Sequence, residues 1–535
     1  MTRPPATAGP LSGNNVNICS AGHWRIPIIQ LLPVLCLLTL LGGCSSLPPN
    51  VERVPSDAVE LSAQTALGEM ALESSAAHPG NSGFSLQESG RDAFLQRAAL
   101  IEAAERSIDA QYYIWNSDIS GRYLARRLLL AADRGVRVRL LLDDINIAGR
   151  DNVLAALASH PGIEIRIYNP FAVRSGPGVM LEAIGDFERI NRRMHNKTFV
   201  VDGAFGIVGG RNIGDEYFGL HAEVNFLDRD MLAAGPIVAD ISRNFDRYWN
   251  SEAAYPVESL AGSKWKPEKI AHAMEAARAS AGDIKSLDCA PPQAPQEARQ
   301  EVAGWLPMLE WARAELVFSD PVQTQPGDSD TPAPTATRLG ELVASGREQI
   351  LMESAYFILA DHHLDEIAKM SARGIQIRAI TNSLASNDLV ANHAGYGRAR
   401  RGMLESGMQL FELRPDAQIC ARCDNDCDGD VSLHAKTMVI DREKLYVGSF
   451  NLNLRSIYLN GETVLIVHSP RLASAVADAI ESSMSPGNSW SVSAGPDGAI
   501  RWVGSDATYD HEPETGFWLR FKAGLFGLLP IEKYL

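Results

Sequence analysis

Two stretches of this chain carry the same set of reactive residues at the same spacing. In each stretch a histidine is followed by a lysine two positions later, by an aspartate five positions after the lysine, and by an asparagine at a fixed offset. The residues are His195, Lys197, Asp202 and Asn212 in the first copy, and His434, Lys436, Asp441 and Asn451 in the second. Two copies in matching context indicate an internally duplicated protein with two half-sites.

The residue types of each half-site suit chemistry at a phosphoryl group. A histidine attacks phosphorus or protonates a leaving oxygen, while lysine and asparagine hold the phosphoryl oxygens. Two facing half-sites supply a nucleophilic and an acidic histidine, and their lysines and amides stabilise the transition state, so we expect no metal or other cofactor. If His195 and His434 were instead ordinary strand histidines, the matched register of the two copies would have no explanation.

The residues after each His-Lys pair predict how the pair is positioned. Residues 198–201 and 437–440 are β-branched or apolar, which is typical of strands, and on a strand residues two apart lie on one face. A turn at Asp202 or Asp441 then leads into a second strand that delivers the asparagine. We expect both aspartates to brace their turns, because an acceptor-only carboxylate is repelled by phosphate.

On these residues, the double pattern resembles the paired HxKx4D signatures of the phospholipase D superfamily. Further segments resemble its bacterial cardiolipin synthase branch, and most closely the C-type members; they are residues 108–115, 169–171, 209–218, 381–386 and 413–415. The resemblance extends from about Ser85 to the C-terminus. It implies that one histidine forms a phosphohistidine intermediate, and that the other protonates the departing alcohol and then activates the acceptor.

The resemblance also implies which groups orient the imidazoles. In the family a carboxylate downstream of the second signature does so, and Glu462 stands at the expected position. In the first half the candidates are Asp228 and Asp230, of which we prefer Asp230. By analogy with the family we take His195 as the nucleophile, ahead of His434.

The two half-sites differ in their polar residues. Asn212, Asn451 and the hydroxyl of Ser449 are expected to bind phosphate, but the first copy has Gly210 where the second has Ser449. The half-sites are therefore not equivalent, which fits a division of labour between the two histidines.

Length and charge restrict the alternatives. A chain of 535 residues is long enough for two domains of roughly 150 to 200 residues each. Its net charge of −16 argues against a nucleic-acid partner, because binding a polyanion needs clustered Lys and Arg. A phospholipase D-like nuclease is thus disfavoured. A non-catalytic lipid-binding scaffold is disfavoured as well, since both His-Lys pairs are intact.

The N-terminal segment predicts where the protein works. The apolar run at residues 26–41 is shorter than the about 20 residues that a membrane span needs, and it ends in Leu-Gly-Gly before Cys44. This resembles a bacterial lipoprotein signal in which Cys44 carries the lipid. The alternative is an uncleaved signal anchor, which also places the domains on the outer side of the inner membrane. We expect a membrane-associated, periplasm-facing protein of the bacterial cell envelope.

Beyond this segment the pattern is α/β. Helix and strand patterns in residues 95–142 recur in residues 337–381, which predicts two phospholipase D-like domains. Each is expected to be a mixed β-sheet flanked by helices, related by a pseudo-twofold axis with the His-Lys strands at the seam. The expected parts are a signal peptide at 1–44, a flexible tether at 45–80, the first domain at 81–285, an inter-domain segment with a Pro-rich linker at 286–335, the second domain at 336–500 and an apolar membrane-interface tail at 501–535.

Three cysteines lie just ahead of the second signature. Cys420, Cys423 and Cys427 are expected to form a disulfide in an oxidising periplasm, with Cys289 as a further partner. A structural metal is the second interpretation of this spacing.

Two more segments have alternative interpretations. The polar loop at residues 382–388 either lines the pocket or is an ordinary solvated turn. Residues 516–530 are strongly apolar but contain Arg520 and Lys522, which fits either a helix in the bilayer interface or a helix docked against the body.

These features predict a phosphatidyltransferase that acts on phospholipid headgroups. The expected reaction joins two phosphatidylglycerol molecules into cardiolipin and releases glycerol, with phosphatidylethanolamine as another donor or acceptor. The alternative is a phospholipase D, in which water intercepts the same intermediate. Pocket shape and water exclusion decide between the two.

Overall fold

The part of the chain that carries both signatures folds into one unit, residues 46–535. The computed structural model describes residues 47–535 apart from 148–150, 175–178, 180, 181, 183, 184, 262–265, 280–290, 322–330, 420–428, 496, 530, 531 and 535. The expected signal peptide with Cys44, most of the expected linker, and the four cysteines at 289, 420, 423 and 427 lie outside the described residues.

Each half contains a mixed sheet whose strands alternate with helices. The first sheet has the order β9-β4-β3-β2-β5-β6-β8-β1, where parallel pairs join β2, β3 and β4 and antiparallel pairs join the rest. Its strands are β1 (Ser82–Gln87), β2 (Ser107–Tyr112), β3 (Arg137–Asp143), β4 (Ile163–Tyr168), β5 (Thr198–Val201), β6 (Phe205–Gly209), β8 (Asp230–Ala234) and β9 (Ala254–Pro256).

The second sheet repeats this arrangement. Its order is β20-β19-β18-β13-β12-β11-β15-β16-β17-β10, with β11, β12 and β13 parallel. Its strands are β10 (Glu310–Phe318), β11 (Gln349–Ser354), β12 (Gln376–Asn382), β13 (Gln409–Leu413), β15 (Lys436–Ile440), β16 (Lys444–Gly448), β17 (Thr463–His468), β18 (Ser489–Ala494), β19 (Ile500–Val503) and β20 (Thr508–Tyr509). The predicted α/β class and duplicated mixed sheets are confirmed.

The two sheets are joined by β1 and β10, which correspond to each other in the two halves. β10 pairs with β1 through Glu310–Ala312 and with β17 through Arg313–Phe318, so all eighteen strands named above belong to one hydrogen-bonded sheet. Strands β5 and β15 lie outside this hydrogen-bonded junction. Both nevertheless contribute to the core shared by the two halves, through Val200 and Val439, in line with their predicted place at the seam. The expected inter-domain segment contains α11 (Pro295–Trp305) and β10. This part of the segment therefore belongs to the folded body.

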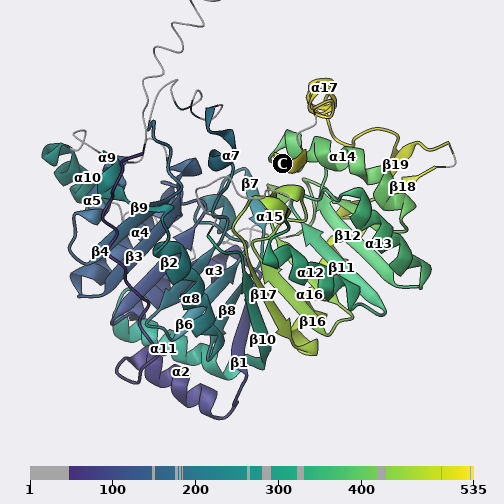
Figure 1. Cartoon of the computed structure of the whole chain (residues 1–535). Helices are drawn as coiled ribbons and strands as arrows, with labels where there is room; N and C mark the ends of the chain where they lie inside the picture. The colour runs from purple at the N-terminus through teal and green to yellow at the C-terminus, as the bar shows by residue number, and fades with distance from the viewer. Residues whose placement is uncertain are drawn as a thin grey trace, which may run out of the picture. The chain divides into compact units, whose positions relative to one another are not determined.

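Helices cover the sheets (Figure 1), and the buried apolar side chains of the described residues form three large cores and a smaller fourth one around Phe245 and Trp249. One core lies within the first half and another within the second. The third contains buried residues of both halves, among them Val200, Ile241, Val439 and Val476. The helices of the first half include α3 (Gly90–Ala103), α4 (Ile119–Asp133), α5 (Asp151–Ala158), α8 (Ile237–Trp249), α9 (Val257–Ala261) and α10 (Pro267–Ala279), and those of the second α12 (Pro334–Ala344), α13 (Asp361–Ala372), α14 (Val390–Glu405) and α16 (Pro470–Ser483).

The segment expected to be a flexible tether is folded against the body from residue 47 onward. Arg53 donates from Nε to the carbonyl of Ala254 at 3.0 Å, and the Ala58 N–H donates to Asp246 at 2.9 Å. Helix α2 (Ala66–Ala76) follows and buries Leu67 and Ala71 in the core of the first half. Residues 45–80 are rich in Ser, Pro and Ala, which is typical of a tether, but apolar residues among them, such as Leu67 and Ala71, pack into the core.

Candidate active site

The two His-Lys pairs lie at the start of equivalent hairpins, β5-β6 and β15-β16. The hairpin turns place Asp202 and Asp441 at φ of 54° and 53°, in the left-handed region, and each carboxylate accepts backbone N–H groups from the loop before β2 or β11. The donors are Glu105, Arg106 and Ser107 for Asp202, and Arg347, Glu348 and Gln349 for Asp441. The prediction that these aspartates brace the turn and the neighbouring backbone is confirmed.

Each imidazole is bonded to a carboxylate from the other half. His195 Nδ1 lies 2.9 Å from Oε2 of Glu462, and His434 Nδ1 lies 2.6 Å from Oδ2 of Asp228. The backbone repeats this crossing, because the His195 N–H donates to Gly461 O and the His434 N–H donates to Leu227 O, both at 2.8 Å. A neutral imidazole that donates from Nδ1 to a carboxylate carries its lone pair on Nε2. Both histidines therefore have Nε2 as the reactive atom.

The sequence-based preference for Asp230 is wrong, and Asp228 holds the position. Asp230 forms an ion pair with Arg97 at 2.7 Å and accepts from the Arg211 N–H at 3.1 Å, within the first half. Asp228 follows β7 (Val224–Leu227), which pairs in parallel with β14 (Asp430–Leu433) of the second half. Because Asp228 and His434 each follow one of these paired strands, they meet side by side.

Ser449, which we expected to bind phosphate, instead belongs to the hydrogen-bond network of Glu462. Its hydroxyl donates to Glu462 Oε2 and accepts from the Thr463 N–H at 3.0 Å. Ser456 Oγ, at 2.7 Å, and Asn460 Nδ2, at 3.2 Å, also donate to Glu462. In the first half a Cβ at Gly210 would lie 2.2 Å from Asp228 Oδ1, so the position that is Ser449 in one half must be glycine in the other.

The two asparagines are buried beside the pairs. Asn212 accepts from the Ile114 N–H at 3.1 Å and donates to the Tyr217 hydroxyl at 3.0 Å. Asn451 is buried too, and its Oδ1 has no hydrogen-bond partner among the described residues. Their phosphate-binding role stays a prediction.

Burial sets the charge state of the site. It lowers the pKa of both His195 and His434 to about 4, with the nearby lysines adding to the effect, so both imidazoles are neutral at pH 7. Burial also lowers the pKa of Lys436 to about 8 and that of Lys197 well below its ordinary value. Lys197 Nζ donates to the His195 carbonyl at 2.6 Å, and Lys436 Nζ to the His434 carbonyl. An anion between the pairs would relieve this concentration of buried donors.

Comparison with known proteins agrees with this geometry. The family described as "Cardiolipin synthase, PLD-like domain" matches residues 98–249 and 339–484. Cardiolipin synthase C of Escherichia coli (strain K12) is 37% identical over 478 residues, which cover 85% of this chain and 96% of that protein. The cardiolipin synthase of Geobacillus kaustophilus (strain HTA426) is 26% identical over 380 residues, which cover 70% of this chain and 60% of that protein.

The chain belongs to the cardiolipin synthase family of PLD-like proteins. The fold likeness reaches further, to the crystal structure of phosphatidylserine synthase from Haemophilus influenzae Rd KW20. That structure matches with a TM-score of 0.56 at 13% identity, over 87% of this chain and all of the other.

Aromatic rings pack against both imidazoles of this chain. The rings of Tyr113 and His195 meet in a T-shaped arrangement at a centroid distance of 4.9 Å, while Tyr217 and Phe226 contact His434 at 5.1 and 5.3 Å. These rings were not predicted from the sequence. The available signal was position, since Tyr113 directly follows β2 and Phe226 lies in β7, two residues before Asp228.

The loop at residues 382–388 supports the second signature. Asn382 Nδ2 donates to the Leu433 carbonyl at 2.8 Å, and its Oδ1 accepts from the Leu433 N–H at 2.7 Å, directly before His434. Ser383 and Ser386 are buried and bond each other, so the solvated-turn interpretation is wrong for them. Asp388 accepts from the Tyr356 hydroxyl at 2.9 Å, and its charge opposes the effect of burial on the pKa of Lys436.

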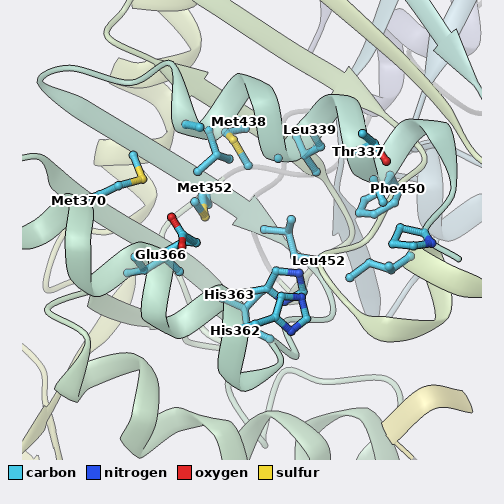
Figure 2. Close-up of a pocket in the computed structure, with 18 of the residues that line it drawn as sticks. Thr337, Leu339, Met352, His362, His363, Glu366, Met370, Met438, Phe450 and Leu452 are labelled. Carbon is cyan, nitrogen blue, oxygen red and sulfur yellow. The ribbon is translucent and has the colours of Figure 1, made fainter. Parts of the chain in front are cut away.

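A separate apolar cavity of about 520 Å³ lies behind the second half-site, between α12 and α13. Figure 2 shows Met352 and Met438 within it and His362 and His363 at one edge. Helix α15 (Leu454–Tyr458) separates the two regions, because its Ile457 and Tyr458 line the cavity while Ser456 bonds Glu462. The wall of the cavity is therefore next to the hydrogen bonds of Glu462, which holds His195.

Two features are absent from the described part of the chain. Across the described residues, no cluster of three or more His, Cys, Asp or Glu side chains is arranged to hold a metal ion. None of the helices in that part of the chain is long and apolar enough to span a membrane.

Proposed function

We propose that this protein is a phosphatidyltransferase that makes cardiolipin from phosphatidylglycerol through a phosphohistidine intermediate. The observation that carries the proposal is the crossed pairing of His195 with Glu462 and of His434 with Asp228. It leaves two Nε2 atoms as a nucleophile and a proton carrier. The Escherichia coli relative, named cardiolipin synthase C, supports the choice of substrate.

In the first step His195 attacks the donor phosphodiester. A bond forms between Nε2 and phosphorus, and the bond from phosphorus to the headgroup glycerol oxygen breaks. His434, protonated once the anion is bound, gives its Nε2 proton to the departing glycerol oxygen. The anion supplies the reason for this protonation, since a negative charge near a buried imidazole raises its pKa.

In the second step the hydroxyl of another phosphatidylglycerol takes the place of glycerol. Neutral His434 accepts the proton of this hydroxyl while the hydroxyl oxygen attacks phosphorus. The bond between phosphorus and His195 Nε2 breaks, and cardiolipin forms. Phosphatidylethanolamine can serve as a further donor by the same steps, with ethanolamine as the departing alcohol. Lys197 and Lys436 hold the equatorial oxygens in both steps, with Asn212 and Asn451 as neutral donors.

Water as the acceptor would make the same site a phospholipase D. Hydrolysis and transfer share the first step, so they differ in what reaches the phosphohistidine. The rings of Tyr113, Tyr217 and Phe226 around the imidazoles limit the polar surface available to water, which favours transfer.

The test is product analysis with phosphatidylglycerol labelled in its acyl chains and, in a parallel reaction, in its headgroup glycerol. Cardiolipin and free glycerol in equal amounts, insensitive to EDTA, are the expected products. Phosphatidic acid as the main product would replace the transferase by a phospholipase D, and no turnover would contradict both.

We also propose that the chain is a lipoprotein, cleaved before Cys44 and exposed to the periplasm. The signal-like run and the Leu-Gly-Gly-Cys sequence support this. Labelled palmitate should enter the wild-type chain and not the Cys44→Ala variant. Incorporation into both would contradict the anchor.

A further inference from the structure

The C-terminal segment exposes apolar side chains to an extent unlike the rest of the described chain. Of fourteen large hydrophobic residues that are exposed, seven lie between residues 517 and 529. They include Trp518, which is 71% exposed, and Leu528, which is 79% exposed. A concentration of this kind indicates an interaction surface, because soluble proteins rarely leave such patches uncovered.

The helix that carries this patch is already packed on its other side. Helix α17 (Phe517–Phe526) lies along α14, and Leu519, Ala523 and Gly527 are partly buried at a four-residue spacing. Phe517, Phe521 and Leu525 have the same spacing on the exposed side. The apolar face of α17 therefore stays exposed although the helix is packed against the body. Docking against the body alone does not account for this face.

The charge of the segment differs from that of the whole chain. Residues 516–531 contain Arg520 and Lys522 and no acidic residue, on a chain of net charge −16. Arg520 is anchored by donation to the Thr515 carbonyl at 2.8 Å, while Lys522 is exposed. Aromatic and aliphatic side chains beside cations match an anionic lipid surface, where rings sit at the headgroup level.

The chain after α17 returns to the active site. Arg455, in α15, donates to the carbonyl of Tyr534 at 3.2 Å and to that of Asn191 at 3.0 Å, four residues before His195. Tyr534 also meets the ring of Phe187, in α7 (Phe187–Ile190), at a centroid distance of 4.6 Å. The apolar segment is thus tied to the edge of the first half-site.

Two further exposed apolar residues lie at the same edge. Phe187 is exposed beside Tyr534. Leu389 is exposed next to Asp388, whose charge acts on Lys436 of the second half-site. In Figure 1, α7, α14, α17 and the C-terminus all lie at the upper end of the view. The elements that carry these exposed apolar residues therefore lie at the same end of the molecule in this view.

We propose that α17 inserts its aromatic face into an anionic phospholipid surface and that Phe187 and Leu389 extend this contact, so that the active site opens toward the bilayer. The inference rests on the proposed function and deepens it, because it states how the site meets a lipid substrate without extracting it into water.

The test compares two forms of one substrate on the full chain. Turnover is measured with phosphatidylglycerol in vesicles of phosphatidylethanolamine and phosphatidylglycerol, and with a short-chain phosphatidylglycerol below its micellar concentration. The Trp518→Ser/Phe521→Ser/Leu525→Ser variant should lose about tenfold or more on vesicles and keep its rate on the dissolved lipid. The matched control, Val54→Ser/Val153→Ser/Met308→Ser, removes three exposed apolar residues elsewhere and should change neither rate.

Equal rates for the α17 variant and the wild type on vesicles would overturn the inference. An equal loss of rate on vesicles and on dissolved lipid would also overturn it, because it would indicate a structural role for these residues. A second measurement does not depend on turnover. Lipids brominated near the headgroup should quench fluorescence in the wild type more than in Trp518→Phe, and equal quenching would overturn the surface. If the wild type turns over neither substrate, the proposed function fails, while quenching still decides the surface.

Discussion

The two half-sites hold their imidazoles by different means. Glu462 accepts from His195 and from three other side chains, those of Ser449, Ser456 and Asn460. Asp228 accepts from His434 and from the Arg229 N–H at 2.8 Å, and it leaves no room for a side chain at position 210. A carboxylate fixed by several donors holds its imidazole in one orientation, which suits a nucleophile. The shorter pair at His434 suits a group that exchanges a proton.

The largest expected effect comes from removing either imidazole. His195→Ala and His434→Ala should each lower kcat by about 10⁴-fold or more, because the nucleophile and the acid act as a unit. Product formation from phosphatidylglycerol and a thermal unfolding curve are the measurements. Substantial turnover in both folded variants would break the two-half-site account.

The carboxylates sharpen the comparison next. Glu462→Gln and Asp228→Asn should each lower kcat by about 10²- to 10⁴-fold, because the imidazole loses its charged partner and its tautomer is no longer fixed. Asp230→Asn is the matched control, since Asp230 pairs with Arg97, and it should affect stability more than kcat. A larger loss of kcat in Asp230→Asn than in Asp228→Asn would contradict the assignment.

The position that differs between the halves predicts unequal effects. Gly210→Ala places a Cβ against Asp228, so kcat should fall nearly as far as in Asp228→Asn. Ser449→Gly removes one of several donors to Glu462, and a loss of about tenfold is expected. Steady-state rates of the two variants test this order, and the reverse order would contradict it.

The buried histidines predict a pH dependence of stability. Their pKa values fall to about 4 on folding from 6.5, so below pH 6.5 the unfolded chain binds protons that the folded chain does not. The free energy of unfolding is therefore independent of these two histidines above pH 6.5. Between pH 6.5 and pH 4 it falls by at most about 1.4 kcal/mol per histidine for each pH unit.

Urea unfolding of the wild type and of His195→Gln/His434→Gln between pH 7 and pH 4, roughly the two pKa limits, measures this contribution. The stability of the variant relative to the wild type should rise as the pH falls. A pH-independent difference would show that the imidazoles are not buried in neutral form.

The smallest effect concerns the cavity behind the second half-site. Gly340 lies in α12, where an added Cβ meets no atom within 4 Å. Gly340→Ala should raise the free energy of unfolding by about 0.5 to 1 kcal/mol, because alanine favours the helix. Urea unfolding checks the gain, and kcat should not change. A loss of stability would show that the cavity wall does not tolerate a methyl group.

The strands and turns that position the two His-Lys pairs were predicted correctly because they depend on short-range patterns. The His-Lys spacing, the turn at Asp202 and the strands beside it are all set within a few residues. The choice between Asp228 and Asp230 was missed because it depends on β7 pairing with β14, which joins residues that are 206 positions apart. For the same reason β10 was taken for part of a linker, since its two partner strands lie in different halves.

The central claim is the division of labour between His195 as nucleophile and His434 as acid, and trapping the intermediate tests it most directly. The wild type is mixed with phosphatidylglycerol labelled at phosphorus, and His434→Ala with a phosphorus-labelled phosphatidyl donor that has a good leaving group. Both reactions are quenched rapidly without acid and digested, and the labelled peptide is sequenced. The account predicts label on the peptide that contains His195, and accumulation of that label in a His434→Ala variant given a donor with a good leaving group. Label on the His434 peptide, or no label in a protein that turns over, would contradict it.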